Sequence, residues 1–328
     1  MISIIGAGAW GTALALAGSR AGNDVTLWAY EREVVTAINE VYENTLYLPG
    51  VALDPGILAT EDMAQAAVAD VLLLAIPAQH LRVTIAPLVG KLAPEIPLIV
   101  CAKGIEQETL ALMSEAVDAT FPENPVFILS GPTFAADVAA GLPTAVTLAG
   151  ADLDAARQIA NRLKSDRFRP YCGDDVIGAQ IGGAVKNVLG IACGIAEGRG
   201  FGDNARAALI TRGLAELTRL CLAKGGQAET MMGLSGLGDL VLTCTSTQSR
   251  NYSLGLALGA GRTLAGILDE RKSVVEGVFT AGAAVALGEK LGIEMPIAGA
   301  VDAVLNRDAD IDVVIEALLS RPLRAEAD

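Results

Sequence analysis

Short apolar runs alternate with helical stretches along the first half of the chain. The clearest run, residues 71–76, is apolar at every position, which is typical of a parallel strand buried on both faces. The runs occupy residues 2–5, 25–30, 70–76, 98–102, 126–129, 144–148 and 168–171. Between them the spacing predicts helices over residues 12–21, 33–41, 62–67, 81–90, 109–119, 134–140 and 152–163, and a loop over 44–56. The alternation predicts an α/β fold with a doubly wound, mostly parallel sheet and helices on both faces.

The pattern changes after residue 174. Strand-like runs largely disappear, and Ala, Leu and Gly recur at helical spacing, with breaks near residues 198–203, 224–227 and 243–248. We therefore expect a sheet domain over residues 1–178 and an all-helical C-terminal domain over residues 179–328.

The first predicted strand runs directly into a Gly-x-Gly-x-x-Gly motif made by Gly6, Gly8 and Gly11. In a strand–turn–helix crossing of this kind, the first glycine allows the tight turn and the second lets the backbone approach a pyrophosphate. The third lets the helix pack closely on the strand, and the helix N-terminus offers N–H groups to the phosphates. The motif predicts a Rossmann-like domain that binds NAD or NADP.

The end of the second predicted strand leaves the choice of cofactor open. An acidic residue is expected there to hold the ribose hydroxyls, and Glu31 is in place for that role. Tyr30 and Arg32 could instead lie beside a 2′-phosphate. These residues do not decide between NAD and NADP.

Composition excludes several classes of function. The chain has 328 residues, of which 52% are apolar and 19% charged, as expected of a globular protein. The net charge of −14 disfavours nucleic acid or an anionic membrane surface as a partner. The five cysteines are widely spaced and read as buried thiols rather than as disulfides or a metal site. Because His80 is the only histidine, we expect no metal site of several histidines and a Lys, Asp, Glu or Tyr as the general acid–base.

Lys186 is the only charged residue between residues 175 and 197. This stretch is apolar, but its central lysine argues against a membrane span. The glycines around it, at positions 182, 183, 190 and 194, indicate that a backbone or a ligand comes close. A lysine in such a helix either extends to solvent or is desolvated, and desolvation would suit it for proton transfer.

A second polar cluster follows at residues 233–251. A glycine-rich turn presents Asp239, which could orient Lys186 or a substrate hydroxyl, and Arg250 with Asn251 offers donors suited to phosphate. A helix-capping aspartate with a surface arginine would give the same pattern. Farther on, Glu276 lies beside a turn and could reach a ribose or an amide. Lys103 and residues 131–133 follow predicted strands, at the edge where such sheets bind ligands.

Seven motifs occur in the order found in one known family. They are residues 6–15, Lys103-Gly104, residues 130–135, residues 183–187, residues 236–240, Ser249-Arg250-Asn251 and Val275-Glu276-Gly277. Over essentially its whole length the chain resembles the prokaryotic-type NAD(P)-dependent sn-glycerol-3-phosphate dehydrogenases. The resemblance implies an oxidoreductase that interconverts dihydroxyacetone phosphate and sn-glycerol 3-phosphate in the cytoplasm for phospholipid synthesis. A homodimer is a further implication of the family.

The resemblance also implies roles for individual residues. Lys186 would be the proton acceptor, with Asp239 in support. Cofactor contacts, beyond the glycine motif, would come from Trp10, Tyr30, Lys103, Ala135, Arg250, Val274 and Glu276. Substrate contacts would come from Lys103, Gly131, Thr133, Lys186, Asp239, Ser249, Arg250 and Asn251. The family often has Arg or His where Tyr30 stands here, which weakens the case for NADP.

Two alternatives stay open at this point. A dehydrogenase of the β-hydroxyacid or 6-phosphogluconate type also combines a glycine-rich motif with an active lysine and a helical domain. A non-enzymatic cofactor sensor would bind the dinucleotide without turnover, and it would leave Lys186 and the Ser-Arg-Asn run without a purpose.

Overall fold

The computed structural model describes residues 1–270, 275–322 and 325. The chain divides into two compact units. The sheet unit comprises residues 1–103 and 113–176, and the helical unit comprises residues 104–112 and 177–328. The chain leaves the sheet unit for good between Val176 and Ile177, two residues before the expected boundary.

The sheet unit contains an eight-stranded sheet in the order β3-β2-β1-β4-β5-β6-β7-β8. All neighbouring strands are parallel except β6 and β7, which are antiparallel. The order reverses between β1 and β4, as in doubly wound folds. The strands are β1 (Ile2–Ile5), β2 (Val25–Trp28), β3 (Ile57–Thr60), β4 (Val71–Leu74), β5 (Leu98–Val100), β6 (Val126–Ser130), β7 (Thr144–Gly150) and β8 (Phe168–Gly173). The predicted doubly wound, mostly parallel sheet is confirmed.

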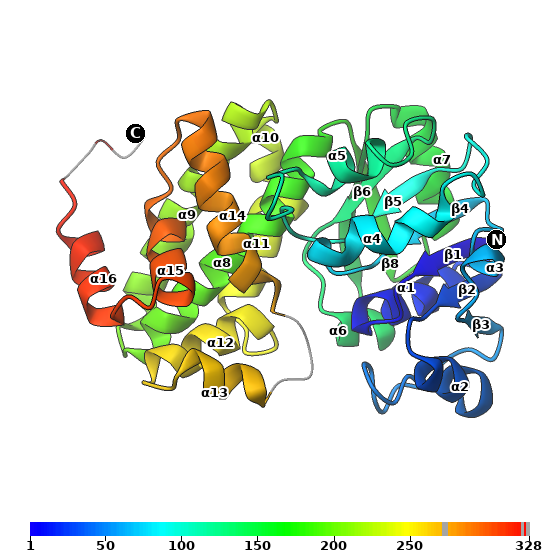
Figure 1. Ribbon diagram of the computed structural model, residues 1–328, viewed down its shortest axis with the longest axis horizontal. Helices are drawn as coiled ribbons and strands as arrows, with labels where there is room; N and C mark the ends of the chain where they lie inside the picture. Colours follow the sequence, from blue (N-terminus) through cyan, green and yellow to red (C-terminus); the bar gives the residue numbers. More distant parts are fainter. Residues whose placement is uncertain (271–274, 323–324, 326–328) are drawn as a thin grey trace. The chain divides into compact units, whose positions relative to one another are not determined.

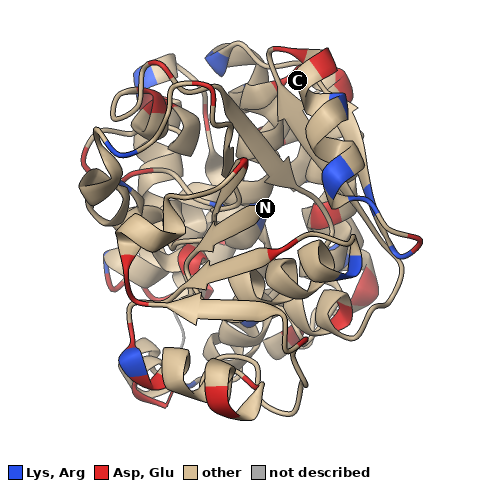
Figure 2. Cartoon of the chain, turned by 90° about the vertical axis from the view of Figure 1, so that its right-hand side faces the viewer, with Lys and Arg blue, Asp and Glu red and all other residues tan. Residues whose placement is uncertain are grey.

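Helices connect these strands. They are α1 (Ala9–Arg20), α2 (Arg32–Val41), α3 (Met63–Ala66), α4 (Leu81–Ile85), α5 (Met113–Asp118), α6 (Ala135–Ala139) and α7 (Leu153–Leu163), with short 3₁₀ turns η1 (Ala78–His80) and η2 (Ala86–Leu88). α1 packs against α6 and α7, whereas α4 packs against α5. The strands form the core because they are almost wholly uncharged, and Figure 2 shows the charged residues mainly on helices and loops. Among the described strands only β8 contains a charged residue, Arg169.

Three local predictions about the sheet unit are wrong. The strand β3 lies where no strand was expected, because its short sequence gives too weak a pattern by itself and depends on pairing with β2. The helix expected over residues 81–90 is divided into α4 and η2, since Pro87 lacks the N–H that a continuous helix needs. The helix expected from residue 109 begins only at Met113.

The segment before α5 belongs to the helical unit. Ile105 and Leu112 form an antiparallel bridge, and both are fully buried in the helical core. Leu110 between them adopts a left-handed conformation with φ of 60°, which a helix would not allow.

The helical unit contains α8 (Val176–Gly198), α9 (Gly202–Lys224), α10 (Ala228–Met231), a π-helical turn η3 (Leu234–Gly238), α11 (Asp239–Cys244), α12 (Arg250–Gly259), α13 (Leu264–Asp269), α14 (Glu276–Leu291), α15 (Pro296–Asn306) and α16 (Ile311–Leu319). Its described residues contain no strand, as predicted. Among the described helices, α8 alone is long and apolar enough to cross a membrane, and 83% of that window is buried. Its environment is therefore that of a core helix. All five cysteines of the chain are free thiols.

The glycines of α8 allow another helix to approach its backbone. A Cβ atom at Gly194 would lie 2.1 Å from the carbonyl oxygen of Tyr252, and one at Gly198 would lie 2.5 Å from that of Leu256. In the opposite direction, a Cβ at Gly255 would lie 2.1 Å from the carbonyl oxygen of Ile191. The glycine pattern predicted that a backbone or a ligand comes close to this helix. At these positions it is the α12 backbone that does so.

Glu216 on α9 caps the N-terminus of α15 from inside the unit. Its two carboxylate oxygens each accept a backbone N–H at 2.9 Å, from Ile297 and Ala298. The side chain is almost completely buried. Burial raises the pKa of Glu216, although the two N–H donors oppose the shift.

We predict that Gly194→Ala lowers the free energy of unfolding by about 1–3 kcal/mol or more, because the added methyl group would overlap the α12 backbone. Gly299→Ala is the matched control, since a Cβ at this position of α15 meets nothing within 4 Å. We expect that change to stabilise the protein by up to about 1 kcal/mol. Urea unfolding of both variants tests the difference, and equal effects would contradict the packing argument.

We predict that Glu216→Gln changes how stability depends on pH. A carboxyl whose pKa is raised by folding contributes stability below its unfolded pKa, and that contribution is lost as the pH rises through the folded pKa. The wild type should therefore gain stability relative to the glutamine variant as the pH falls from neutral through this window. Urea unfolding at several pH values measures the difference, and a pH-independent difference would refute the assignment.

Candidate active site

The glycine motif lies where the strand order of the sheet reverses. Gly6 has φ of +109°, and a Cβ there would lie 2.6 Å from the carbonyl oxygen of Ala75, just after β4. A Cβ at Gly11 would lie 1.8 Å from the carbonyl oxygen of Gly6. Glycine is therefore required for the turn itself at both positions.

Gly8 and Trp10 leave hydrogen-bond donors available for a ligand beside the turn. A Cβ at Gly8 would meet no atom of the described residues within 4 Å, so the position is open, and a side chain would fill it. Gly8 is also the N-cap of α1, and no side chain caps that helix end. The N–H groups of the first turn remain for a ligand. The buried indole Nε1–H of Trp10 has no hydrogen-bond partner among the described residues either. An anionic acceptor would satisfy these donors.

The end of β2 brings the predicted ribose-binding region beside this turn. Gly6 donates its N–H to the carbonyl oxygen of Trp28 at 3.0 Å. Tyr30 is 83% exposed, and Glu31 accepts a hydrogen bond of 2.7 Å from the hydroxyl of Tyr47. Sequence reasoning placed Tyr47 in an undefined loop and missed its contact with Glu31.

The predicted residues after β5 and β6 meet at one carbonyl group. The Lys103 Nζ donates to the carbonyl oxygen of Gly131 at 2.9 Å, and the Thr133 hydroxyl donates to the same oxygen at 3.2 Å. Gly131 has φ of +150°, and a Cβ there would lie 3.0 Å from Val146 Cα. Ala135 is the first residue of α6. Parallel strands thus bring these residues to the carboxyl edge of the sheet, where the sequence places them.

In the helical unit, Lys186 and Asp239 form a buried ion pair. Lys186 is 6% exposed and Asp239 is 0% exposed. The Lys186 Nζ donates to Asp239 Oδ1 and, at 2.9 Å, to the hydroxyl of Thr243. Of the two alternatives for Lys186, the structure supports desolvation and excludes extension to solvent. It also gives the ammonium a partner charge, which compensates for its burial.

Two features of the backbone position this pair. α8 passes close to the π-helical turn, since a Cβ at Gly182 would lie 2.3 Å from the carbonyl oxygen of Ser235. Asp239 follows the turn as the first residue of α11, and Thr243 lies four residues later on the same helix face. This i,i+4 spacing is visible in the sequence and could have identified Thr243 as the second partner of Lys186.

Asn251 connects three helices beside the ion pair. Its Nδ2 donates to Asn187 Oδ1 on α8 at 2.9 Å, and its Oδ1 accepts the N–H of Gly277 on α14 at 3.1 Å. Ser249 caps α12 by accepting the N–H of Tyr252 at 3.2 Å. Asn251 and Ser249 therefore have structural partners in addition to any role toward a ligand.

Arg250 and Glu276 begin adjacent helices. Arg250 is the exposed first residue of α12, and Glu276 is the first residue of α14, close enough for its charge to act on the Arg250 guanidinium. Val274, the remaining predicted cofactor residue, lies outside the described residues.

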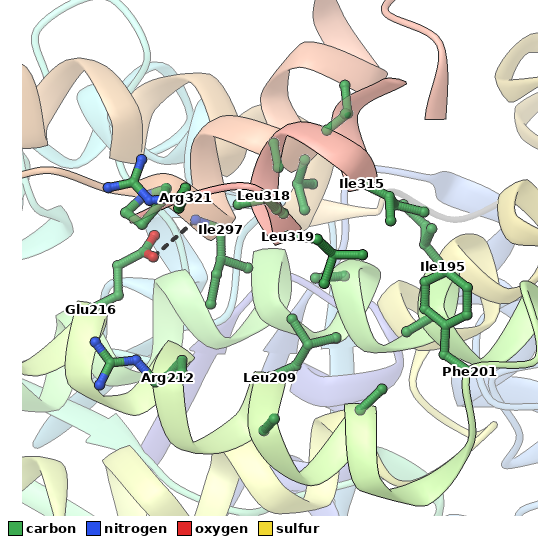
Figure 3. A pocket seen from close by; sticks show the side chains of 18 of the residues that line it. Ile195, Phe201, Leu209, Arg212, Glu216, Ile297, Ile315, Leu318, Leu319 and Arg321 are labelled. Carbon is green, nitrogen blue, oxygen red and sulfur yellow. Dashed lines mark hydrogen bonds between the residues drawn. The ribbon is translucent and has the colours of Figure 1, made fainter. Parts of the chain in front are cut away.

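The helical unit also has a cavity of about 630 Å³ that is separate from the predicted residues. It lies among α8, α9, α15 and α16, and its lining is mainly apolar, with Arg212, Glu216 and Arg321 at one end (Figure 3). None of the predicted catalytic, cofactor or substrate residues lines it.

Family comparisons cover most of the chain. The model of the N-terminal domain of NAD-dependent glycerol-3-phosphate dehydrogenase matches residues 1–156, and that of the C-terminal domain matches residues 175–316.

Individual proteins give the same result. The chain is 58% identical over 326 residues to a glycerol-3-phosphate dehydrogenase [NAD(P)+] from Rhodospirillum rubrum, covering 99% of this chain and 93% of the relative. It is 55% identical over 325 residues to one from Parvibaculum lavamentivorans, with 99% and 98% covered. Among solved structures, a glycerol-3-phosphate dehydrogenase from Coxiella burnetii has a TM-score of 0.93 at 39% identity, with 98% of both chains covered.

We predict that Asp239→Leu lowers the free energy of unfolding by about 3–5 kcal/mol, because it leaves the Lys186 ammonium buried without a counter-charge. The double variant Lys186→Met with Asp239→Leu removes both charges and should lose markedly less stability. A double-mutant cycle by urea unfolding measures the coupling, and additive effects would mean that the two side chains do not interact.

Proposed function

Because the chain belongs to the NAD-dependent glycerol-3-phosphate dehydrogenase family, we propose that it interconverts sn-glycerol 3-phosphate and dihydroxyacetone phosphate. The observation that carries this proposal is the buried Lys186–Asp239–Thr243 cluster. In this cluster the Lys186 ammonium is a desolvated proton donor whose hydrogen-bond partners are defined. The supply of glycerol 3-phosphate to phospholipid synthesis, the cytoplasmic location and the homodimer remain predictions from the resemblance.

The sheet unit would hold the cofactor. Gly6, Gly8 and Gly11 shape the pyrophosphate turn, and the buried donor of Trp10 lies in the same turn. Tyr30, Lys103 and Ala135 extend this surface along the carboxyl edge of the sheet. We propose Arg250, Val274 and Glu276 as further cofactor contacts, as the resemblance implies. When bound, NAD(P) supplies or accepts the hydride.

Lys186 would handle the proton at the substrate oxygen. In the reductive direction its ammonium hydrogen-bonds the carbonyl oxygen at C2 and donates a proton as negative charge develops there. In oxidation the neutral amine accepts the proton of the C2 hydroxyl. Asp239 and Thr243 hold Nζ in place, and the negative charge of Asp239 favours return to the ammonium form.

Substrate phosphate requires donors with fixed directions. Arg250 can supply a planar set of N–H donors, and Asn251 is held by Asn187 and Gly277. We propose that these residues, with Ser249, Lys103, Gly131 and Thr133, bind the phosphate and the substrate backbone. Fixing the phosphate positions C2 for reaction and rejects analogues that lack it.

The two alternatives fit less well. Family membership argues against the β-hydroxyacid and 6-phosphogluconate types, and it argues against a sensor without turnover. A panel of hydroxyacids and sugar phosphates, assayed through nicotinamide absorbance, tests both alternatives. Oxidation of NADH that depends on dihydroxyacetone phosphate would support the proposal, and its absence in the wild type would overturn it.

We predict that Lys186→Ala lowers kcat by about 100- to 10,000-fold, the range for loss of a general acid. Arg250→Ala should instead raise the KM for dihydroxyacetone phosphate by about 10- to 100-fold, because a charged hydrogen bond to phosphate is lost. Steady-state kinetics on protein shown to be folded by circular dichroism tests both changes. The exposed Lys164→Ala and Arg157→Ala are matched controls and should leave the kinetics unchanged. Unchanged turnover in Lys186→Ala would remove this lysine from the mechanism.

A further inference from the structure

The acidic residue at the carboxyl end of β2 is held by a tyrosine from a separate loop. Glu31 is the N-cap of α2, and its Oε1 accepts the hydroxyl of Tyr47 at 2.7 Å. Burial, together with the Glu31 hydrogen bond, raises the pKa of Tyr47 to about 12. The phenol therefore stays protonated at neutral pH and keeps donating to the carboxylate.

The same loop is fixed to the glycine motif. Asn44 is completely buried, and its Nδ2 donates to the carbonyl oxygen of Ala7 at 2.7 Å and to the Thr12 hydroxyl at 2.8 Å. Its Oδ1 accepts the N–H of Tyr47 at 3.0 Å. One amide side chain thus joins the pyrophosphate turn to the backbone of the residue that holds Glu31. We call Asn44 and Tyr47 the loop clamp.

A fixed carboxylate at this place in the fold has two effects on the ribose of the adenosine half. It accepts hydrogen bonds from the 2′- and 3′-hydroxyls, and it repels a 2′-phosphate. Tyr47 occupies one oxygen of Glu31 and restricts the side chain, so less conformational entropy is lost when the ribose binds.

The neighbouring charges also favour a ribose with free hydroxyls over one that carries a 2′-phosphate. Glu33, two residues farther along α2, adds a second negative charge, which also acts on Tyr47. Arg32 is the exposed residue between them, and it is the one cation in the run of residues 30–36. A 2′-phosphate would meet two carboxylates and one guanidinium here.

We infer that Tyr47, held by Asn44, is a positioning residue that orients Glu31 toward the adenosine ribose and makes the enzyme prefer NAD to NADP. This inference rests on the proposed function, because it assigns the specificity of the same cofactor site. Glu31 is the residue that contacts the ribose, and Tyr47 acts through it.

The test compares the binding of NADH and NADPH to the purified full-length protein by isothermal titration calorimetry. We expect the wild type to bind NADH at least about tenfold more tightly than NADPH, the effect of one hydrogen bond to a charged group. Glu31→Gln should reduce this ratio to near one. Tyr47→Phe keeps the ring and removes the hydroxyl, and it should reduce the ratio by about three- to tenfold.

Two controls separate positioning from general effects. Tyr42→Phe is the matched change at an exposed tyrosine of the same region, and Glu33→Gln removes a nearby charge without removing the Tyr47 hydrogen bond. We expect Tyr42→Phe to leave the ratio unchanged and Glu33→Gln to alter it less than Glu31→Gln does. A merely structural role for Tyr47 would weaken both nucleotides equally and leave their ratio unchanged, which would overturn the inference.

The failure of this inference differs from the failure of the proposed function. Tighter binding of NADPH than of NADH, reversed by Arg32→Gln, would assign the site to the 2′-phosphate and overturn the inference. The proposed function would still stand if dihydroxyacetone phosphate were reduced. A protein that binds either nucleotide but reduces no dihydroxyacetone phosphate would contradict the proposed function instead.

Discussion

The proposed chemistry of this protein depends on one charged pair that is removed from water. The ammonium of Lys186 and the carboxylate of Asp239 lie inside a helical core, and neither would be stable there without the other. A buried pair contributes little to stability compared with apolar residues of the same size. Its retention is better explained by a role in which a proton donor must be held still and kept out of bulk solvent.

Glycine makes this burial possible. The backbones of α8, α12 and the π-helical turn come within a distance that any Cβ atom would prevent, at Gly182, Gly194 and Gly255. The helices therefore pack closely, and little space remains for side chains between them. Asn251 also holds the start of α14, so that Arg250 and Glu276 project from fixed helix ends. The close backbone packing thus also determines where the polar groups lie.

Much of this arrangement could be predicted from the sequence, for identifiable reasons. The buried strands of the sheet are continuous apolar runs, and the glycine motif has a fixed relation to strand and helix, so both were recognisable. Lys186 stood out because no other charge lies near it in sequence. Its ion pair with Asp239 spans 53 residues, so the sequence left Asp239 open between orienting Lys186, orienting a substrate hydroxyl and capping a helix. Asn44 and Tyr47 gave no signal at all, because their roles arise only when a loop folds back onto β1 and β2. The strand β3 was missed for a similar reason, since its pairing with β2 defines it.

The path of the chain has a consequence for the autonomy of the two units. Residues 104–112 leave the sheet unit after β5, contribute Ile105 and Leu112 to the helical core, and return to the sheet unit at α5. The polypeptide thus passes from one unit to the other three times, at residues 103/104, 112/113 and 176/177. A fragment that begins at Ile177 would lack part of its own hydrophobic interior, and one that ends at Val176 would expose two apolar side chains. Neither fragment would contain a complete hydrophobic core. Truncation or domain exchange between Val176 and Ile177 would therefore give proteins with incomplete cores.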